Sequence, residues 1–155
     1  MAEHWPIGKD RVVRTWRDPE VIERLLTTPA TWAVVGLSAN TERTAYRIGQ
    51  YLRDRLGMRI VPVNLRGEDA LGEPGYRRLA DVPGSVQVVD CFVNSQRVGA
   101  VVDQAIAEKD RLGIKAVWLQ LGVIDEAAAQ RARAVGLDVV MNTCPAMEAP
   151  AVDAG

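Results

Sequence analysis

The sequence predicts an α/β protein in which helices cover both faces of a parallel sheet. Five short apolar runs rich in Val and Ile recur along the chain, and their hydrophobicity is mostly continuous rather than alternating. Continuous hydrophobicity is typical of strands that are covered on both faces. Segments with apolar residues at helical spacing separate most of these runs, which predicts strand–helix–strand units with right-handed crossovers. The predicted strands span residues 32–36, 59–63, 87–92, 116–119 and 137–141.

A helix is predicted before the first strand, with Asp18 as its N-cap and Pro19 at its first position. An apolar stripe follows, so this helix should pack on the sheet. The residues before it carry little periodicity. We therefore expect an irregular N-terminal extension over residues 1–17, a folded domain over residues 18–148 and a loose C-terminal tail over residues 149–155.

Three more helices are predicted between the strands, each with apolar residues at helical spacing and a glycine after its end. The first follows the first strand. The second follows the third strand and has Asn94 or Ser95 as its cap, and the third has Asp125 as its cap. Residues 76–81, before the third strand, are expected to form a turn or two of helix. The terminating glycines are Gly57, Gly113 and Gly136.

These elements predict a doubly wound, Rossmann-like sheet with the strand order 3-2-1-4-5. Ligands of such sheets bind beyond the carboxyl ends of the strands, at the point where the strand order reverses. With the predicted order, the reversal lies between the first and fourth strands. This rule nominates the loops at residues 36–44 and 120–124.

Length, composition and charge exclude several classes of protein. The chain has 155 residues, 48% of them hydrophobic and 25% charged, which is typical of one globular domain. Its formal net charge of -1 provides no global attraction for a nucleic acid. The longest apolar runs, of about five residues, are too short to cross a membrane. Two cysteines and an N-terminus without an apolar stretch favour the cytoplasm.

No catalytic or metal site is predicted. The only histidine, His4, lies in the predicted extension without an acidic partner nearby, so a Ser-His-Asp triad is not expected. Cys91 and Cys144 are too far apart in sequence to form a cluster of metal ligands with it. Cys91 is expected in the core. Cys144 is expected at the ligand-binding edge of the sheet, where a structural role is favoured over a reactive one.

The loop after the first strand has the composition of a phosphate-binding loop. Backbone N–H groups, hydroxyls and the positive end of the next helix would meet there. Arg47, at the start of the same helix, and Arg66, after the second strand, would add further cations at this corner. The alternative is that these residues only turn the chain and cap the helix. The loop residues that favour phosphate binding are Gly36, Ser38, Asn40, Arg43 and Thr44.

The class of nucleotide can be narrowed further. A dinucleotide-binding fingerprint needs G-x-G-x-x-G after the first strand and an acidic residue about 20 residues later, and neither is present. A P-loop is also absent from the sequence. Arg66 suits a phosphorylated ribose better than a free diol. Coenzyme A (CoA) or NADP therefore fits this sequence better than NAD.

A series of short motifs is spread evenly over residues 20–148. They are Gly36-Leu-Ser38 with Arg43, Pro62-Val-Asn64, Leu71-Gly-Glu73, Leu79 to Pro83, Trp118 to Gly122 and Met141 to Glu148. In this order they resemble the small bacterial stand-alone CoA-binding proteins, relatives of the CoA-binding domain of succinyl-CoA synthetase alpha subunits. The resemblance implies a Rossmann-like domain that holds CoA, with its pyrophosphate near the first loop and its phosphorylated ribose near the end of the second strand.

The resemblance and the loop positions nominate a set of cofactor-binding residues. Trp118 and Gln120 are included because they could line the thioester arm, although a core position is the alternative for Trp118. The chain departs from the family pattern at Ala45, Leu65 and Val93, where the pattern has serine, proline and arginine. The nominated residues are Gly36, Leu37, Ser38, Asn40, Arg43, Thr44, Asn64, Arg66, Phe92, Trp118, Gln120 and Gly122.

Three functions are compatible with the sequence. The first is a CoA-binding or acyl-CoA-binding protein without chemistry of its own, which acts as a carrier, sensor or accessory module and has either a protein partner or a second copy of itself. The second is an NADP-type redox protein, which Arg66 favours and the missing glycine fingerprint opposes. The third is a Rossmann-like interaction protein that has lost its ligand. No nucleic-acid or membrane partner is expected.

Overall fold

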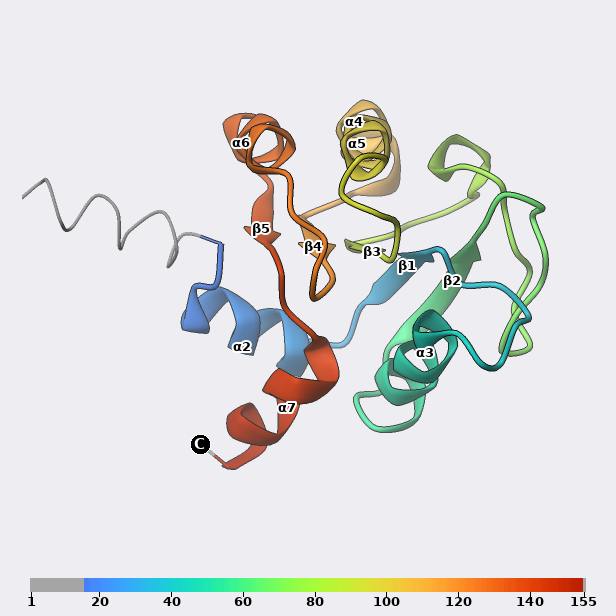
Figure 1. The fold of residues 1–155 in the computed structure, drawn as a ribbon, viewed down its shortest axis with the longest axis horizontal. Coiled ribbons are helices and arrows are strands. Elements are labelled where there is room, and N and C mark those ends of the chain that lie inside the picture. Colours follow the sequence, from blue (N-terminus) through green and yellow to red (C-terminus); the bar gives the residue numbers. More distant parts are fainter. Residues whose placement is uncertain (1–15, 155) are drawn as a thin grey trace, which may run out of the picture.

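A computed structural model describes residues 16–154 of the chain. Its centre is a sheet of five parallel strands with helices on both faces (Figure 1). The predicted α/β class and Rossmann-like architecture are therefore confirmed, and the strands lie within one residue of their expected limits. They are β1 (Thr31–Val35), β2 (Arg59–Val63), β3 (Val88–Cys91), β4 (Ala116–Leu119) and β5 (Asp138–Val140).

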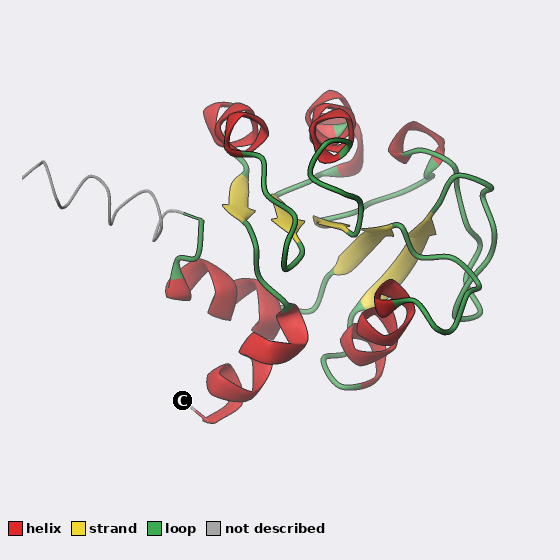
Figure 2. Cartoon of the chain, in the orientation of Figure 1, coloured by secondary structure: helices red, strands yellow, loops and turns green. Residues whose placement is uncertain are grey.

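Two sets of helices cover the two faces of the sheet (Figure 2). The helices are α2 (Pro19–Thr27), α3 (Thr44–Asp54), α4 (Val98–Ala107), α5 (Lys109–Leu112), α6 (Glu126–Ala134) and α7 (Pro145–Ala154). On one face, α4, α5 and α6 pack on a core that includes Val89 and Val117. On the other face, α2, α3 and α7 pack on a core that includes Trp32 and Trp118. No helix in the described part of the chain is long and apolar enough to cross a membrane.

The predicted caps hold two of the helix starts. The Asp18 carboxylate accepts a hydrogen bond of 2.9 Å from the Glu20 N–H. The Asp125 carboxylate accepts one of 3.0 Å from the Ala128 N–H. At the third start, Asn94 rather than Ser95 orders the turn before α4, because its Oδ1 accepts from two successive backbone N–H groups. These bonds satisfy donors that the first turn of a helix leaves free.

The predicted strand order is wrong, because the sheet has the order β2-β1-β3-β4-β5. β1 pairs with β2 on one side and with β3 on the other, so that Val34 lies between Pro62 and Asp90. The physical reason is visible at Pro62. Proline has no N–H to donate to a neighbouring strand and is therefore confined to edge strands. β2 is such an edge strand, and the reversal of strand order consequently lies between β1 and β3.

The connection from β2 to β3 contains only one short helical segment, the 3-10 turn η1 (Leu79–Asp81). The turn or two of helix expected at residues 76–81 is thus limited to three residues. Leu79, Val82 and Val86 of this connection are buried in the core on the α4 face. A loop rather than a regular helix therefore covers β1 and β2 on this face.

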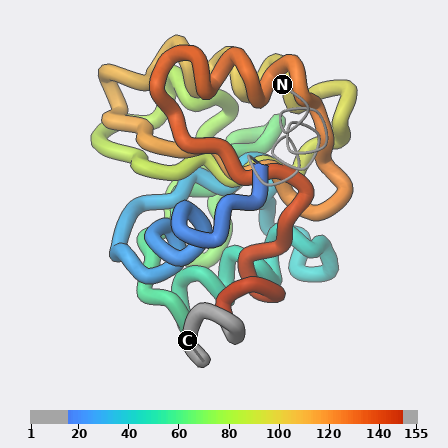
Figure 3. The backbone as a smooth tube through the Cα atoms, turned by 90° about the vertical axis from the view of Figure 1, so that its left-hand side faces the viewer, coloured from blue at the N-terminus to red at the C-terminus, as the bar shows by residue number. Residues whose placement is uncertain are grey.

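Both ends of the folded domain differ from the expected limits. Trp16 is buried, and its carbonyl accepts a hydrogen bond of 2.8 Å from the Met141 N–H, so the domain begins before residue 18. Residues 1–15 of the predicted extension, with His4, lie outside the described residues. The predicted loose tail is wrong, because α7 continues to Ala154. Figure 3 shows α7 against α2, which it contacts, and this packing places residue 149 in the core.

Asp90 is a fully buried carboxyl group in the middle of β3. It lies on the same face of the strand as Val88, towards the core of α2, α3 and α7, because side chains alternate along a strand. Neither of its oxygens has a hydrogen-bond partner within the described residues 16–154. Burial raises the pKa of Asp90 well above its usual range, since water cannot solvate the charged form.

This burial predicts a characteristic dependence of stability on pH. Between the pKa of Asp90 in the unfolded chain and its raised pKa in the folded chain, the folded state holds a proton that the unfolded state has lost. The free energy of unfolding should then fall as the pH rises through this window. In Asp90→Asn, this fall in the free energy of unfolding, which is up to about 1.4 kcal/mol per pH unit in wild type, should be absent. Above the pH window, the variant should therefore be more stable than wild type.

Denaturant titrations at several pH values between 4 and 9 measure this slope. Asp110→Asn serves as the control, because the Asp110 side chain is 98% exposed. Equal slopes for wild type and Asp90→Asn would contradict the assignment of the proton to Asp90.

Candidate functional site

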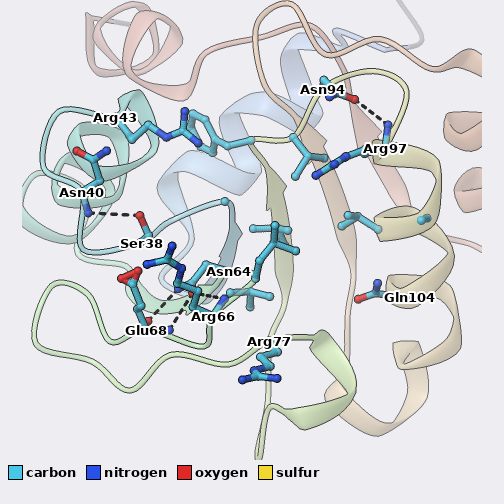
Figure 4. A pocket seen from close by; sticks show the side chains of 18 residues that line it. Ser38, Asn40, Arg43, Asn64, Arg66, Glu68, Arg77, Asn94, Arg97 and Gln104 are labelled. Carbon is cyan, nitrogen blue, oxygen red and sulfur yellow. Dashed lines mark hydrogen bonds between the residues drawn. The ribbon is translucent and has the colours of Figure 1, made fainter.

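A cavity of about 850 Å³ lies at the carboxyl ends of β1, β2 and β3. This volume is in the upper part of the range of small-molecule and cofactor sites, which is about 300 to 1,000 Å³. Its walls come from the loops after these three strands and from one side of α4 (Figure 4). The polar lining residues are Ser38, Asn40, Arg43, Asn64, Arg66, Glu68, Arg77, Asn94, Arg97 and Gln104.

The cavity occupies the point at which the strand order reverses, as the rule for doubly wound sheets requires. Because this point lies between β1 and β3, only one of the two nominated loops takes part. Residues of the 36–44 loop line the cavity, whereas those of the 120–124 loop do not. The prediction of the second loop followed from the wrong strand order.

Gly36 sets the shape of the cavity floor. Its φ of +107° is a conformation that side chains rarely adopt. A Cβ atom at this position would lie 2.6 Å from the carbonyl oxygen of Phe92, at the end of β3. The Gly36 N–H also donates to the Val63 carbonyl over 2.7 Å. Glycine therefore allows the ends of three adjacent strands to approach one another before the chain turns into the loop.

Ser38 and Asn40 shape the loop that leads from β1 to α3. The Asn40 N–H donates to Ser38 Oγ over 3.3 Å (Figure 4). The Glu42 N–H donates to Asn40 Oδ1 over 3.0 Å. The residue before α3 is Arg43, whose side chain does not cap the helix. The N-terminus of α3 thus keeps its positive end beside the cavity, where it favours an anion.

Asn64 joins the loops after β1 and β2. Its Nδ2 donates to the carbonyl oxygens of Leu37 and Glu68, each over 2.9 Å. Its Oδ1 accepts from the backbone N–H groups of Arg66 and Glu68 over 3.2 and 2.8 Å. Two donor hydrogens and two acceptor positions are all that a side-chain amide offers. The Asn64 side chain is therefore fully used within the protein, and it positions Arg66 rather than offering a free group to a ligand.

Four arginines make the cavity strongly basic. Arg43, Arg66, Arg77 and Arg97 line it, and Glu68 is the one carboxylate among the described lining residues. None of the four guanidinium groups has a hydrogen bond or an ion pair to another residue in the range 16–154. An excess of three positive charges is thus gathered in one cavity of a chain whose formal net charge is -1.

The sequence interpretation found Arg43 and Arg66 but missed Arg77 and Arg97. It also placed Arg47 at this corner, and Arg47 is not among the lining residues. Arg97 directly precedes α4 and lies three residues after Asn94. Because Asn94 was a predicted cap of this helix, the position of Arg97 at the helix start could have been predicted from the sequence. Arg77 follows Tyr76, whose carbonyl accepts from the Asn64 N–H over 2.9 Å. This pairing brings Arg77 to the end of β2, and no local pattern in the sequence indicates it.

Several nominated residues lie outside the cavity. Leu37 is fully buried against the α3 face. Thr44 is the exposed first residue of α3 and is not among the lining residues. Trp118 is fully buried, as its core alternative predicted, and its Nε1 donates to the Thr143 carbonyl over 2.8 Å. Its ring centroid lies 5.5 Å from that of Trp32.

Gln120, Gly122 and the cysteines lie elsewhere as well. Gln120 is 6% exposed, and the Gly122 N–H donates to Asn142 Oδ1 over 2.7 Å. Cys91 is fully buried, and burial raises the pKa of its thiol. Cys144 is a half-buried free thiol that packs against the core on the α3 face. The structure brings together Gly36, Ser38, Asn40, Arg43, Asn64, Arg66 and Phe92 of the nominated residues.

Comparison with known proteins identifies relatives of similar size. The chain is 30% identical over 123 residues to the uncharacterized protein YneT of Bacillus subtilis (strain 168), and the match covers 79% of this chain and 87% of that protein. A solved structure of a hypothetical protein from Pyrococcus horikoshii OT3 superimposes with a TM-score of 0.78 at 34% identity. That match covers 86% of this chain and 91% of the other.

A larger relative shares part of its length with this chain. The alpha subunit of acetate–CoA ligase (ADP-forming) II from Pyrococcus furiosus is 28% identical over 89 residues, which is 57% of this chain. The match spans 19% of that subunit. A family model described as a CoA binding domain matches residues 30–150, well over half of the chain. The chain therefore belongs to the CoA binding domain family.

Proposed function

We propose that this chain binds coenzyme A in the cavity at the carboxyl ends of β1, β2 and β3. The observation that carries the proposal is the set of four arginines around that cavity, none of which pairs with another residue of the described range 16–154. CoA carries a pyrophosphate and a ribose phosphate, and guanidinium groups bind phosphate oxygens through charge-assisted hydrogen bonds. The apolar residues between the arginines suit the uncharged parts of the ligand. They are Val35, Val63, Leu65, Phe92, Val93, Ala100 and Val101.

The parts of CoA are assigned by the chemistry of each wall. The pyrophosphate binds at the N-terminus of α3, beside Ser38 and Arg43, where the helix dipole and a cation act together. The ribose phosphate binds at Arg66, whose backbone N–H is fixed by Asn64. The family resemblance predicts the same two positions.

We further propose that the chain holds CoA or acyl-CoA as a carrier, sensor or accessory module. Apart from Gly36, the Ser38 hydroxyl and the Glu68 carboxylate, the lining consists of arginines, amides and apolar side chains, which are groups suited to binding a nucleotide. The relative that is named as an acetate–CoA ligase subunit shares only a fifth of its length with this chain.

Isothermal titration with CoA, acetyl-CoA, NADP and NAD tests the ligand. We expect heat of binding from the two CoA species, weaker binding of NADP, and none from NAD, which lacks the ribose phosphate. Binding should weaken as salt is raised from about 50 to 300 mM, because ions screen the arginines from the phosphates. Equal affinity for NADP and CoA would contradict the proposal.

Charge reversal tests the position of the phosphates. Arg43→Glu and Arg66→Glu should each weaken CoA binding by at least tenfold, since a charge-assisted hydrogen bond contributes about 1.5 to 3 kcal/mol. Arg59→Glu is the matched control, because Arg59 is an exposed arginine at the opposite end of β2 from Arg66. If Arg43→Glu and Arg66→Glu both bind as Arg59→Glu does, the phosphates lie elsewhere.

Substitution of Gly36 tests the floor of the cavity. Gly84 is the control, because it also has a positive φ but nothing lies within 4 Å of its Cβ position. Gly84→Ala should therefore cost only the strain of the positive φ, about 1 to 3 kcal/mol of stability. Alanine at Gly36 adds overlap with the Phe92 carbonyl, which should cost about 1 to 3 kcal/mol more. Denaturant unfolding of the two variants measures the difference. Gly36→Ala should also lose CoA affinity, whereas Gly84→Ala should retain it.

A further inference from the structure

One side of α4 forms a complete wall of the cavity. Arg97, Ala100, Val101 and Gln104 all line it, and they are spaced at three, four and seven residues from Arg97. Residues at this spacing lie above one another on one side of a helix. The wall thus presents a cation at its start, small apolar side chains in its middle and an amide at its end. Figure 4 shows Gln104 far along α4 from Arg97.

Gln104 is half-buried, and its side chain has no hydrogen-bond partner in the described part of the chain. This differs from Asn64, whose side-chain amide is fully used within the protein. A free side-chain amide in a cavity can donate through Nε2 and accept through Oε1 at the same time. Gln104 therefore offers a paired donor and acceptor beside the apolar surface of Ala100 and Val101.

A purine base has the complementary chemistry. Glutamine binds adenine by accepting from its amino group and donating to a ring nitrogen. The flat, uncharged face of the base suits the apolar middle of the wall, whereas the phosphates require the arginines. Resting on the proposed function, we infer that the α4 wall binds the adenine base of CoA and that Gln104 recognises the edge carrying its amino group.

The test pairs a change in the protein with a change in the ligand. In 1,N6-etheno-CoA an added ring blocks the amino group of adenine. Wild type should bind CoA about threefold to tenfold more tightly than etheno-CoA, the effect of one neutral hydrogen bond. Gln104→Met, which keeps the length of the side chain but lacks the amide, should bind both ligands alike. Gln96→Met is the control, because Gln96 is exposed and lies outside the cavity lining.

A third ligand separates the base from the pantetheine arm, whose amide groups could also pair with Gln104. Adenosine 3′,5′-bisphosphate contains the base and lacks the arm. Gln104→Met should weaken its binding by the same factor as it weakens CoA binding. Unchanged binding of the bisphosphate, or a preference for CoA over etheno-CoA that survives in Gln104→Met, would overturn the inference while leaving CoA binding intact. Absence of CoA binding to wild type would instead overturn the proposed function and, with it, this inference.

Discussion

The pairing of β1 with β2 on one side and with β3 on the other determines where a ligand can bind. The connection from β1 passes over one face of the sheet and the connection from β2 returns over the other, so the two diverge above the carboxyl ends of the strands. The same pairing brings the Phe92 carbonyl to the position where a side chain at residue 36 would lie. Only a residue that has no Cβ and tolerates a positive φ fits there. The path of the loop that carries Ser38 and Arg43 follows from this steric constraint.

The arginines of the cavity differ from several others in what they do for the fold. Arg111 donates to the carbonyl oxygens of Leu79 and Val82 and thereby holds η1. Arg131 pairs with the Asp103 carboxylate over 3.0 Å. The four cavity arginines have no such partner among the residues that the structure describes, and their like charges repel one another. Gathering them therefore costs folding free energy, and the proposed ligand, with its several phosphates, would offset this cost on binding.

Most of the fold could be predicted from local patterns, because continuous apolar runs, helix caps and glycines act over a few residues. Strand order could not be obtained in this way, since right-handed crossovers permit several orders. Pro62 carried the missing information, because a strand with a proline belongs at an edge. The error had a physical consequence for the site: it moved the expected reversal towards β4 and thereby nominated Trp118 and Gln120, which lie outside the cavity. Arg77 could not be found, because only the tertiary pairing of Asn64 with Tyr76 brings it to the site.

Asn64 shows that a residue of a binding motif can act by ordering the loops around the site. Its amide holds two loops together, while its neighbour Arg66 keeps a free charge. The departures from the family pattern can likewise be divided into those that affect the order of the loops and those that affect the charge of the lining. Leu65 is 82% exposed and its side chain takes no part in the Asn64 hydrogen bonds. Val93 removes a cation from the end of β3, but Arg97, four residues later, lines the same cavity. These two departures change the lining, and the four arginines that remain still give it an excess of positive charge, which fits a charged nucleotide ligand.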